Sequence, residues 1–513
     1  MCSQLAKCGK NNLQNLIRRF QRLEASPSRV HCLQTIKTSG TKGLFFGVHA
    51  LKLLNFDTFS HFLITKTCFL DKNNVNFEKI SQKKIYSKAV NMLVSFTVGN
   101  FRSFKENKTF SMKATSIQEL KEFVREDNNF KLLPSIAIYG ANSSGKSNLL
   151  SAIGMMKKIL LSSVKTNPTE ELKTDPFKLD ELYPQKPTFF EVVFTSGDDT
   201  YKYGFEYSPR KINREWLYTI KNDKEKPLFV RNDEGIGITK EFPEGNGKEE
   251  ATVENRLFLS LVAQLNGKIS KSIMGWFEDL RVTSGVKDDD FKNFSIKYLF
   301  ANNEKSKKAT DFLKGMDLGF SNIREAETGL KKYASDNITG IEALLKFIPD
   351  ELNNALKFPT LETGHIVRKK DGQPSEAFFS NDEMESEGTK KIINMSGPII
   401  DTLEKGGIIV IDEFDAKLHP LLTKKIIEIF NSPETNPNKA QLIFATHDTN
   451  LLSNKIFRRD QIWFAEKNRE DESTDIYPLS EIKEQNGEKI RNDRVYEKDY
   501  INGRYGAIPF LRS

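Results

Sequence analysis

Residues 140–147 form a complete G-x-x-x-x-G-K-[ST] loop, Gly140-Ala141-Asn142-Ser143-Ser144-Gly145-Lys146-Ser147. The loop follows the apolar run Ile136–Tyr139 and precedes a helix-competent stretch that begins at Asn148, which is the context that this motif requires. Glycines let the backbone approach phosphate groups, while the loop N–H groups and the helix N-terminus supply positive potential. We expect the loop and Asn148 to bind a nucleotide, with Lys146 reaching its β and γ phosphates and the Ser147 hydroxyl ligating Mg²⁺.

A short apolar strand that ends in two carboxylates is the second motif, Gly407-Ile-Ile-Val-Ile-Asp412-Glu413. In open α/β sheets the ligand lies outside the carboxyl ends of the strands, which is where these acids fall. We expect Asp412 to hold Mg²⁺ through its water shell and Glu413 to orient and deprotonate the attacking water. Without the loop at 140–147, this run would as readily be a strand that enters a polar loop.

A histidine follows a third apolar strand, Gln441-Leu-Ile-Phe-Ala-Thr-His447-Asp448. It lies 35 residues after Asp412, and that spacing accommodates one crossover helix, so the two strand tips can be neighbours. We therefore predict that His447 senses the γ-phosphate and holds the attacking water. The alternative is that His447 has a purely structural role.

The run Glu385-Ser386-Glu387-Gly388-Thr389 precedes a predicted helix. Ser386 suits an N-cap, so one interpretation is a simple helix start. The sharper interpretation is a helix N-terminus whose Ser386 hydroxyl and Gly388 N–H face a γ-phosphate. Because one chain cannot easily aim this helix at its own loop, the phosphate would belong to a partner's nucleotide.

The remaining pattern predicts an α/β fold. Strands and helices alternate over the last 130 residues, which favours a parallel sheet. Antiparallel strands are expected over 188–230, and 251–350 is expected to be mostly helical. The stretch 116–128 is helix-prone, a hairpin is expected over 365–379, and one further helix is expected over 449–455. We predict four parts: an N-terminal extension (1–91), an ATPase lobe with an antiparallel β subdomain (92–240), a mainly helical insertion (241–380) and a second ATPase lobe (381–513).

Charge is distributed unevenly along the 513 residues. Residues 1–91 hold 15 Lys/Arg against 4 Asp/Glu, whereas the rest holds 62 against 65, so the pI of 8.9 belongs to the N-terminal segment. That segment is interpreted in three ways: a start assigned upstream of the true Met92, a nucleic-acid-binding arm, or a targeting segment. Four cysteines fit a reducing compartment, which indicates the cytoplasm, and the absence of a long apolar run predicts no membrane segment.

With these motifs in place, residues 92–513 resemble an ABC-type ATPase head of the SMC and OLD kind. More narrowly, they resemble the bacterial AAA family ATPases that include the RloA and abortive-infection (AbiL-type) group. Four stretches carry the resemblance besides the P-loop: the opening Met92–Phe104, the signature-like Ser386–Thr389, the Walker B extension and D-loop at Glu413–Pro420, and the C-terminal Tyr500–Pro509.

This resemblance implies an ATPase that uses ATP and Mg²⁺. It implies a homodimer with two ATP molecules held between one subunit's P-loop and the other's signature, with Asp415 and His419 near the subunit contact. The implied role is the ATPase component of an anti-phage system that acts with a separate effector. The alternative is a DNA-repair or OLD-like ATPase that acts directly on nucleic acid. A nuclease domain is disfavoured, because only 66 residues follow His447.

Overall fold

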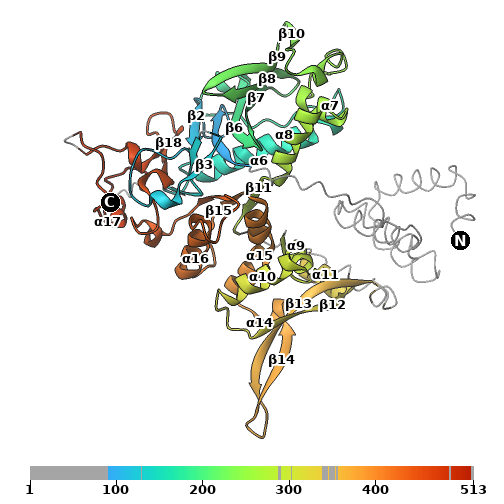
Figure 1. Ribbon diagram of the computed structural model, residues 1–513, viewed down its shortest axis with the longest axis vertical. Helices are drawn as coiled ribbons and strands as arrows, with labels where there is room; N and C mark the ends of the chain where they lie inside the picture. The colour runs from blue at the N-terminus through green and yellow to red at the C-terminus, as the bar shows by residue number, and fades with distance from the viewer. Residues whose placement is uncertain are drawn as a thin grey trace, which may run out of the picture. The chain divides into compact units, whose positions relative to one another are not determined.

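The computed structural model describes residues 91–128, 130–286, 291–301, 303–337, 356–484 and 487–509, together with positions 345, 350 and 353. The chain divides into two compact units, residues 1–85 with 334–355 and residues 86–333 with 356–513. Nearly all of the described residues belong to the second unit, whose elements are labelled in Figure 1. The predicted basic extension over 1–91 lies outside the described residues, apart from Asn91.

A six-stranded sheet with the order β11-β15-β16-β5-β17-β18 organises the centre of this unit. Its strands are β5 (Ser135–Tyr139), β11 (Arg281–Ser284), β15 (Ile408–Asp412), β16 (Gln441–Ala445), β17 (Ile462–Lys467) and β18 (Thr474–Pro478). All neighbours are parallel except β17 and β18, which run antiparallel. The continuous apolar runs explain the buried strands, because a parallel sheet is covered on both faces.

Alternate residues of β15 face two different hydrophobic cores. Ile408 and Val410 pack in one core with buried residues of α6 (Lys146–Ser162). Ile409 and Ile411 pack in the other core, with α15 (Glu387–Lys405) and α16 (Pro420–Asn431). The helix carrying the P-loop and the helix carrying the signature motif therefore belong to different cores, with this sheet contributing to both.

A seven-stranded antiparallel sheet, in the order β10-β9-β8-β7-β6-β1-β2, contributes to the core of α6. Its strands are β1 (Leu93–Gly99), β2 (Lys108–Ser111), β6 (Thr188–Ser196), β7 (Asp199–Tyr207), β8 (Ile212–Lys221), β9 (Lys224–Asn232) and β10 (Gly235–Ile238). Helices α7 (Phe258–Gln264) and α8 (Lys268–Asp279) join the same core, where Trp276 stacks on Phe194 with 4.3 Å between ring centroids. The antiparallel strands expected over 188–230 are thus confirmed.

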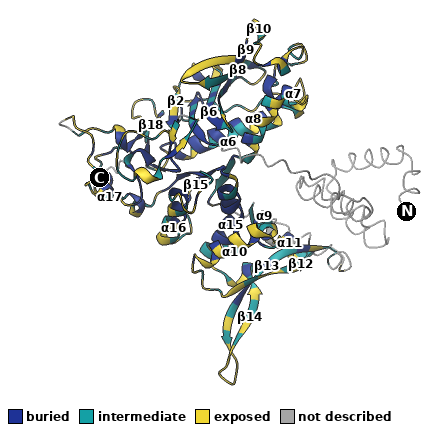
Figure 2. Cartoon of the chain, in the orientation of Figure 1, coloured by how far each residue is buried: buried dark blue, intermediate teal, exposed yellow. Residues whose placement is uncertain are grey.

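A three-stranded antiparallel sheet precedes the signature motif in the sequence. It consists of β12 (Asn322–Gly329), β13 (Lys357–Arg368) and β14 (Pro374–Ser380), and the short α14 (Asn381–Met384) follows it. Helices α9 (Lys292–Leu299) and α10 (Glu304–Lys314) contact α15, and α11 (Leu330–Asn337) follows β12. The β13–β14 hairpin turns at Asp371-Gly372 as predicted, and Figure 2 shows its far end exposed.

Three secondary-structure expectations are wrong. Helices do occupy much of 251–350, but residues 281–284 and 322–329 of that range are strands β11 and β12. The helix predicted over 449–455 is only a 3₁₀ turn at Thr449–Leu451, which the Asp448 side chain caps. The helix-prone stretch 116–128 contains a 3₁₀ turn (Lys121–Phe123) and β3 (Arg125–Asp127), which pairs with β4 (Phe130–Leu132).

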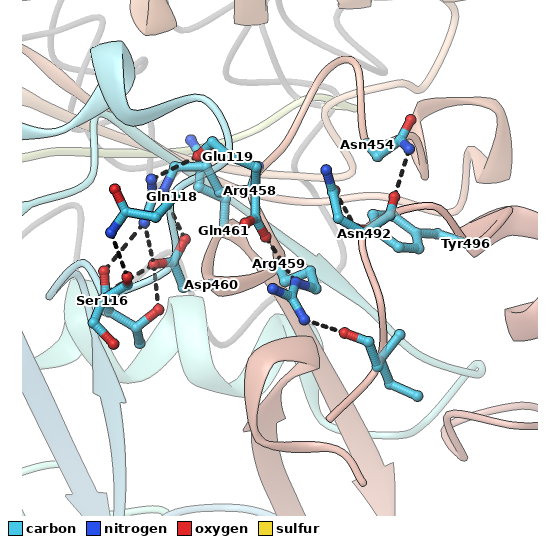
Figure 3. Close-up of polar contacts among 12 residues, drawn as sticks. Ser116, Gln118, Glu119, Asn454, Arg458, Arg459, Asp460, Gln461, Asn492 and Tyr496 are labelled. Carbon is cyan, nitrogen blue, oxygen red and sulfur yellow. Dashed lines mark hydrogen bonds and ion pairs between the residues drawn. The ribbon is translucent and has the colours of Figure 1, made fainter. Parts of the chain in front are cut away.

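The loop before β17 is held by a fully buried ion pair (Figure 3). Arg458 donates to both carboxylate oxygens of Asp460 at 2.9 Å and to the Glu119 carbonyl at 2.8 Å. Arg459 pairs with the Glu119 side chain at 2.7 Å. These bonds fix the segment around residue 119 to the start of β17.

The last described helix is α17 (Tyr496–Ile501), and no helix in the described ranges is long and apolar enough to cross a membrane.

Candidate functional site

Three parallel strands end at the same edge of the central sheet, and each delivers one of the predicted motifs. Strand β16 pairs with β15 on one side and with β5 on the other. Residues beyond the strand ends stay hydrogen-bonded: Phe414 donates its N–H to the Ala445 carbonyl at 3.0 Å, and Thr446 donates to Ile138 at 3.2 Å. The P-loop, the two acids and His447 are therefore neighbours.

The P-loop backbone depends on its glycines. Gly140 and Gly145 have φ values of 155° and 106°, which disfavour any residue with a Cβ. A Cβ at Gly140 would lie 2.3 Å from the Ala465 carbonyl oxygen, and one at Gly145 would lie 2.1 Å from Thr474 Oγ1. The loop thus fits tightly against β17 and β18, and helix α6 begins directly after it at Lys146.

The Lys146 side chain is buried, and its ammonium donates to two carbonyls of its own loop, Gly140 at 2.7 Å and Ala141 at 3.0 Å. Burial lowers the pKa of Lys146 to about 8 and outweighs the opposing effect of three carboxylates. Those carboxylates belong to Asp412, Asp415 and Glu413. The predicted catalytic lysine therefore lies within electrostatic reach of the predicted metal ligand and general base.

Residues 412–416 form a tight turn. The Glu413 backbone has φ 50°, in the left-handed region that non-glycine residues rarely adopt, and its side chain is exposed. Lys391 of α15 is fully buried and donates to the carbonyls of Phe414 at 2.9 Å and Ala416 at 2.7 Å. A Cβ at Gly285 would lie 2.2 Å from the Glu413 carbonyl oxygen. Packing from two other segments thus sets where the Glu413 side chain projects.

His447 lies among the same charges. Desolvation by its surroundings and the nearby Lys146 ammonium lower the pKa of His447, although Asp415, Glu413 and Asp412 oppose the shift. At neutral pH the imidazole is therefore mainly uncharged. The His447 backbone N–H donates to both Asp415 carboxylate oxygens at 3.4 Å. Asp415 of the predicted D-loop and His447, both singled out from the sequence, are therefore in direct contact.

The signature-like element takes the capping geometry expected of it. Ser386 is the N-cap of α15, and its hydroxyl accepts a hydrogen bond from the Thr389 N–H at 3.1 Å. A Cβ at Gly388 would lie 2.7 Å from the Lys417 carbonyl oxygen. Within the described part of the chain, the recorded bonds of residues 386–389 run to one another, Lys390 and Lys417, and none reaches residues 140–148. In the described structure Ser386 and Gly388 therefore make no hydrogen bond to the chain's own P-loop, and α15 and α6 pack in different hydrophobic cores.

Several residues beside the P-loop were missed in the sequence. Thr474 bonds both the Ser144 carbonyl at 2.9 Å and the Ser103 hydroxyl at 2.7 Å, and Asn148 donates to Ser103 at 2.7 Å. A pocket of about 230 Å³ opens next to them. Its lining includes Arg102, Ser103, Ser143, Asn148, Asp175 and Phe177. Thr474 lies more than 300 residues from the loop and belongs to no motif, so nothing in the sequence pointed to it.

The residues present fit a nucleoside triphosphate with Mg²⁺. The Ser144 hydroxyl is buried without a hydrogen-bond partner, and it is set in a loop whose backbone leaves no room for a Cβ at either flanking glycine. Ser147 and Asp412 supply the hard oxygen donors that Mg²⁺ prefers. Within the described ranges no three His, Cys, Asp or Glu side chains cluster as metal ligands.

Residues 135–453 match the profile of a family described as "AAA domain, putative AbiEii toxin, Type IV TA system". The chain belongs to this AAA-domain family. The matched range of the AAA domain covers the P-loop, the 386–389 element, both carboxylates and His447. Together with the sheet order, it confirms the α/β P-loop NTPase part of the predicted fold class.

Among solved structures, the AAA-domain chain is similar to the SMC head domain from Thermotoga maritima, at 12% identity and a TM-score of 0.34, over 75% of this chain and 98% of that one. It is also similar to an SMC head bound to the C-terminal winged-helix domain of ScpA, at 12% identity and a TM-score of 0.38, over 75% and 97% of the two chains. The recombination mediator RecF matches at 12% identity and a TM-score of 0.30, over 76% and 99%. No curated protein matches.

Proposed function

We propose that the protein binds ATP with Mg²⁺ and hydrolyses it. The observation that carries the proposal is the convergence of Lys146, Glu413 and His447 at one edge of the sheet, with Asp412 beside them. Residues 140–148 would enclose the phosphates, and Ser147 and Asp412 would hold Mg²⁺. The cation, when bound, neutralises charge on the phosphate oxygens.

Each side chain then has one task in the hydrolysis. The exposed Glu413 carboxylate accepts a proton from water as the water oxygen bonds to the γ-phosphorus. Lys146 stabilises the negative charge that builds on the bridging oxygen as its bond to the γ-phosphorus breaks and ADP departs. The uncharged His447 imidazole holds the water and the γ-phosphate in line.

The active unit on this proposal is a homodimer that encloses two ATP molecules. The support is that the 386–389 helix start makes no hydrogen bond to the chain's own P-loop within the described residues, although it has the helix N-terminus and hydroxyl that suit a phosphate. Ser386 and Gly388 would contact the nucleotide of the second subunit, and Asp415 would lie near the contact.

The biological role we propose is the ATPase component of a bacterial anti-phage system, of the abortive-infection kind, acting in the cytoplasm with a separate effector protein. The support is the family description, which names an AbiEii toxin and a type IV toxin–antitoxin system. Dimerisation around ATP would switch the effector between two states.

Glu413→Gln tests the proposal, because the amide keeps the shape of the side chain but cannot accept the proton. We expect the variant to bind ATP as tightly as wild type, to hydrolyse it at least about 100-fold more slowly and to accumulate as a dimer with ATP and Mg²⁺. Sedimentation velocity with and without ATP measures the dimer. A variant that stays monomeric at saturating ATP contradicts the sandwich, and one that hydrolyses at the wild-type rate contradicts the catalytic assignment.

Direct action on nucleic acid is the second candidate function. One observation favours it: Arg368, Lys369 and Lys370 are consecutive and exposed at the tip of the β13–β14 hairpin. Three adjacent cations on a projecting turn suit a phosphate backbone.

A further inference from the structure

The chain enters the signature element directly from the three-stranded sheet. Strand β14 ends at Ser380, the four-residue α14 ends at Met384, and Glu385 alone separates α14 from the N-cap Ser386. With so short a connection, a shift of β14 changes where Ser386 and the first turn of α15 lie. The sheet therefore bears on the element that, on the proposed function, contacts the partner's nucleotide.

The Glu385 side chain makes a second connection to the same sheet. It is only 6% exposed, and its carboxylate accepts a hydrogen bond from His365 Nε2 at 2.9 Å. A carboxylate at this depth is costly without such a partner. His365 belongs to β13, lies 3.2 Å from the Thr363 hydroxyl through the same nitrogen, and packs its ring 5.9 Å from that of Phe379 on β14. The histidine is thus oriented by both strands of the hairpin.

The acidic residues of α14 are held differently. Asp382 pairs with Lys292 of α9 at 2.7 Å, and Glu383 pairs with Lys332 of α11 at 2.5 Å. These ion pairs tie α14 to helices, whereas the contact at Glu385 ties the residue next to the N-cap to the hairpin itself. A displacement of β13 would therefore reach the signature element through the His365–Glu385 bond.

We propose that His365 is a positioning residue for the ATPase: through Glu385 it holds Ser386 and Gly388 in the orientation that receives the partner's nucleotide, so that the state of the β12–β13–β14 sheet sets ATP-dependent dimerisation. This inference rests on the proposed function.

The test compares His365→Ala with His365→Gln in the full-length chain, each also combined with Glu413→Gln to retain ATP. Glutamine keeps an N–H donor on a similar reach, whereas alanine does not. We expect His365→Ala to weaken the ATP-dependent dimer and lower kcat by about tenfold, the typical effect of removing one hydrogen bond to a nearly buried charge. ATP affinity of the monomer, measured at dilute protein, should stay within about twofold, and His365→Gln should recover most of the dimer.

Arg324→Gln is the matched control, because it removes an ion pair on the same sheet, to Glu362 at 2.7 Å, that does not touch Glu385. It should leave dimerisation unchanged. A Glu385→Gln variant and its combination with His365→Ala close a double-mutant cycle, in which the combined loss should not exceed the larger single loss. The cycle and the glutamine variant keep the test decisive even if alanine destabilises the sheet.

Two outcomes overturn the inference. In one, His365→Ala dimerises and hydrolyses ATP as wild type does. In the other, the losses of the two single variants multiply in the double variant. Failure of the proposed function looks different, because the wild-type chain itself would then neither bind ATP nor dimerise with it.

Discussion

The pKa of the Lys146 ammonium is lowered, and the effect of this shift can be measured. Burial lowers its pKa to about 8, whereas phosphate oxygens in the loop would favour the charged form. Above pH 8 the free protein has lost this proton and must take it up again on binding. We therefore expect ATP affinity to fall as the pH rises above about 8, by up to about tenfold per pH unit.

Calorimetric titration between about pH 7 and 9.5, in buffers that differ in ionisation enthalpy, measures both the affinity and the proton uptake. Lys146→Arg keeps its charge throughout and should show a flat profile, and Lys146→Ala should not bind ATP detectably. Flat wild-type affinity across this range would place the ammonium elsewhere in the bound state.

Ser386 allows two roles at one helix start to be separated. Replacement by alanine removes the cap and should cost about 1 kcal/mol in the free energy of unfolding. Aspartate also caps helices well and favours the positive helix end, so Ser386→Asp should fold as stably as wild type. Its added charge would repel the partner's phosphates, and we expect the ATP-dependent dimer to be lost. Denaturant unfolding and sedimentation velocity measure the two effects; a Ser386→Asp variant that dimerises normally refutes the phosphate contact.

Strand β11 and the residue after it, Gly285, pack against the turn at residues 412–416. The Gly285 N–H donates to the Asp412 carbonyl at 2.6 Å, and a Cβ there would clash with the Glu413 carbonyl and approach Lys391 Nζ at 2.7 Å. Gly285→Ala should therefore lower kcat by at least about tenfold while ATP affinity changes little. Gly275→Ala in α8 is the control, since open space surrounds it and alanine favours a helix. Equal activity of both variants would show that the turn tolerates displacement.

The sequence predicts elements well where one strong signal is present. Strands β5, β15 and β16 are continuous apolar runs, and the hairpin turn has its Asp371-Gly372 pair, so all four could be placed. Strand β11 could not, because Arg281-Val-Thr-Ser284 is short, half-buried and mixed in character. The burial of Lys391 could not be predicted either, because this residue follows the polar run Ser386–Lys390 and its sequence context is that of a solvated lysine.

At the scale of the molecule, the sequence motifs predicted the candidate catalytic residues but not the residues that line the pocket beside them. The predicted catalytic residues follow the carboxyl ends of strands that a P-loop sheet brings together. The pocket beside the loop combines Ser103, Asp175 and Glu472, and long-range contacts of this kind follow from the tertiary fold alone. The division into four domains stays a prediction. Strand β11, which lies within the expected insertion, pairs with β15 of the second predicted lobe.

Charge at this scale bears on the nucleic-acid alternative. Residues 92–513 carry slightly more acidic than basic side chains, so any polyanion contact by this part must be local. If the protein acts on nucleic acid through the hairpin tip, Lys369→Glu with Lys370→Glu should weaken duplex DNA binding and reduce its salt dependence by about two counterions. Fluorescence anisotropy over a salt series measures this. A Lys331→Glu variant, away from the tip, is the control, and unchanged binding by the tip variant removes the hairpin from that function.

The two hydrogen bonds from Lys146 to its own loop give the site an internal competitor. The ammonium has three N–H donors, and the two carbonyls already occupy two of them, so an incoming molecule finds only one donor free and recognition starts from a deficit. A triphosphate recovers that deficit through many charged oxygens along residues 140–148. A nucleoside brings no charged oxygen, and a monophosphate brings too few to span the loop. If the protein binds nucleotides as proposed, the closed arrangement of the loop would select them by the length of their phosphate chain before any base is read.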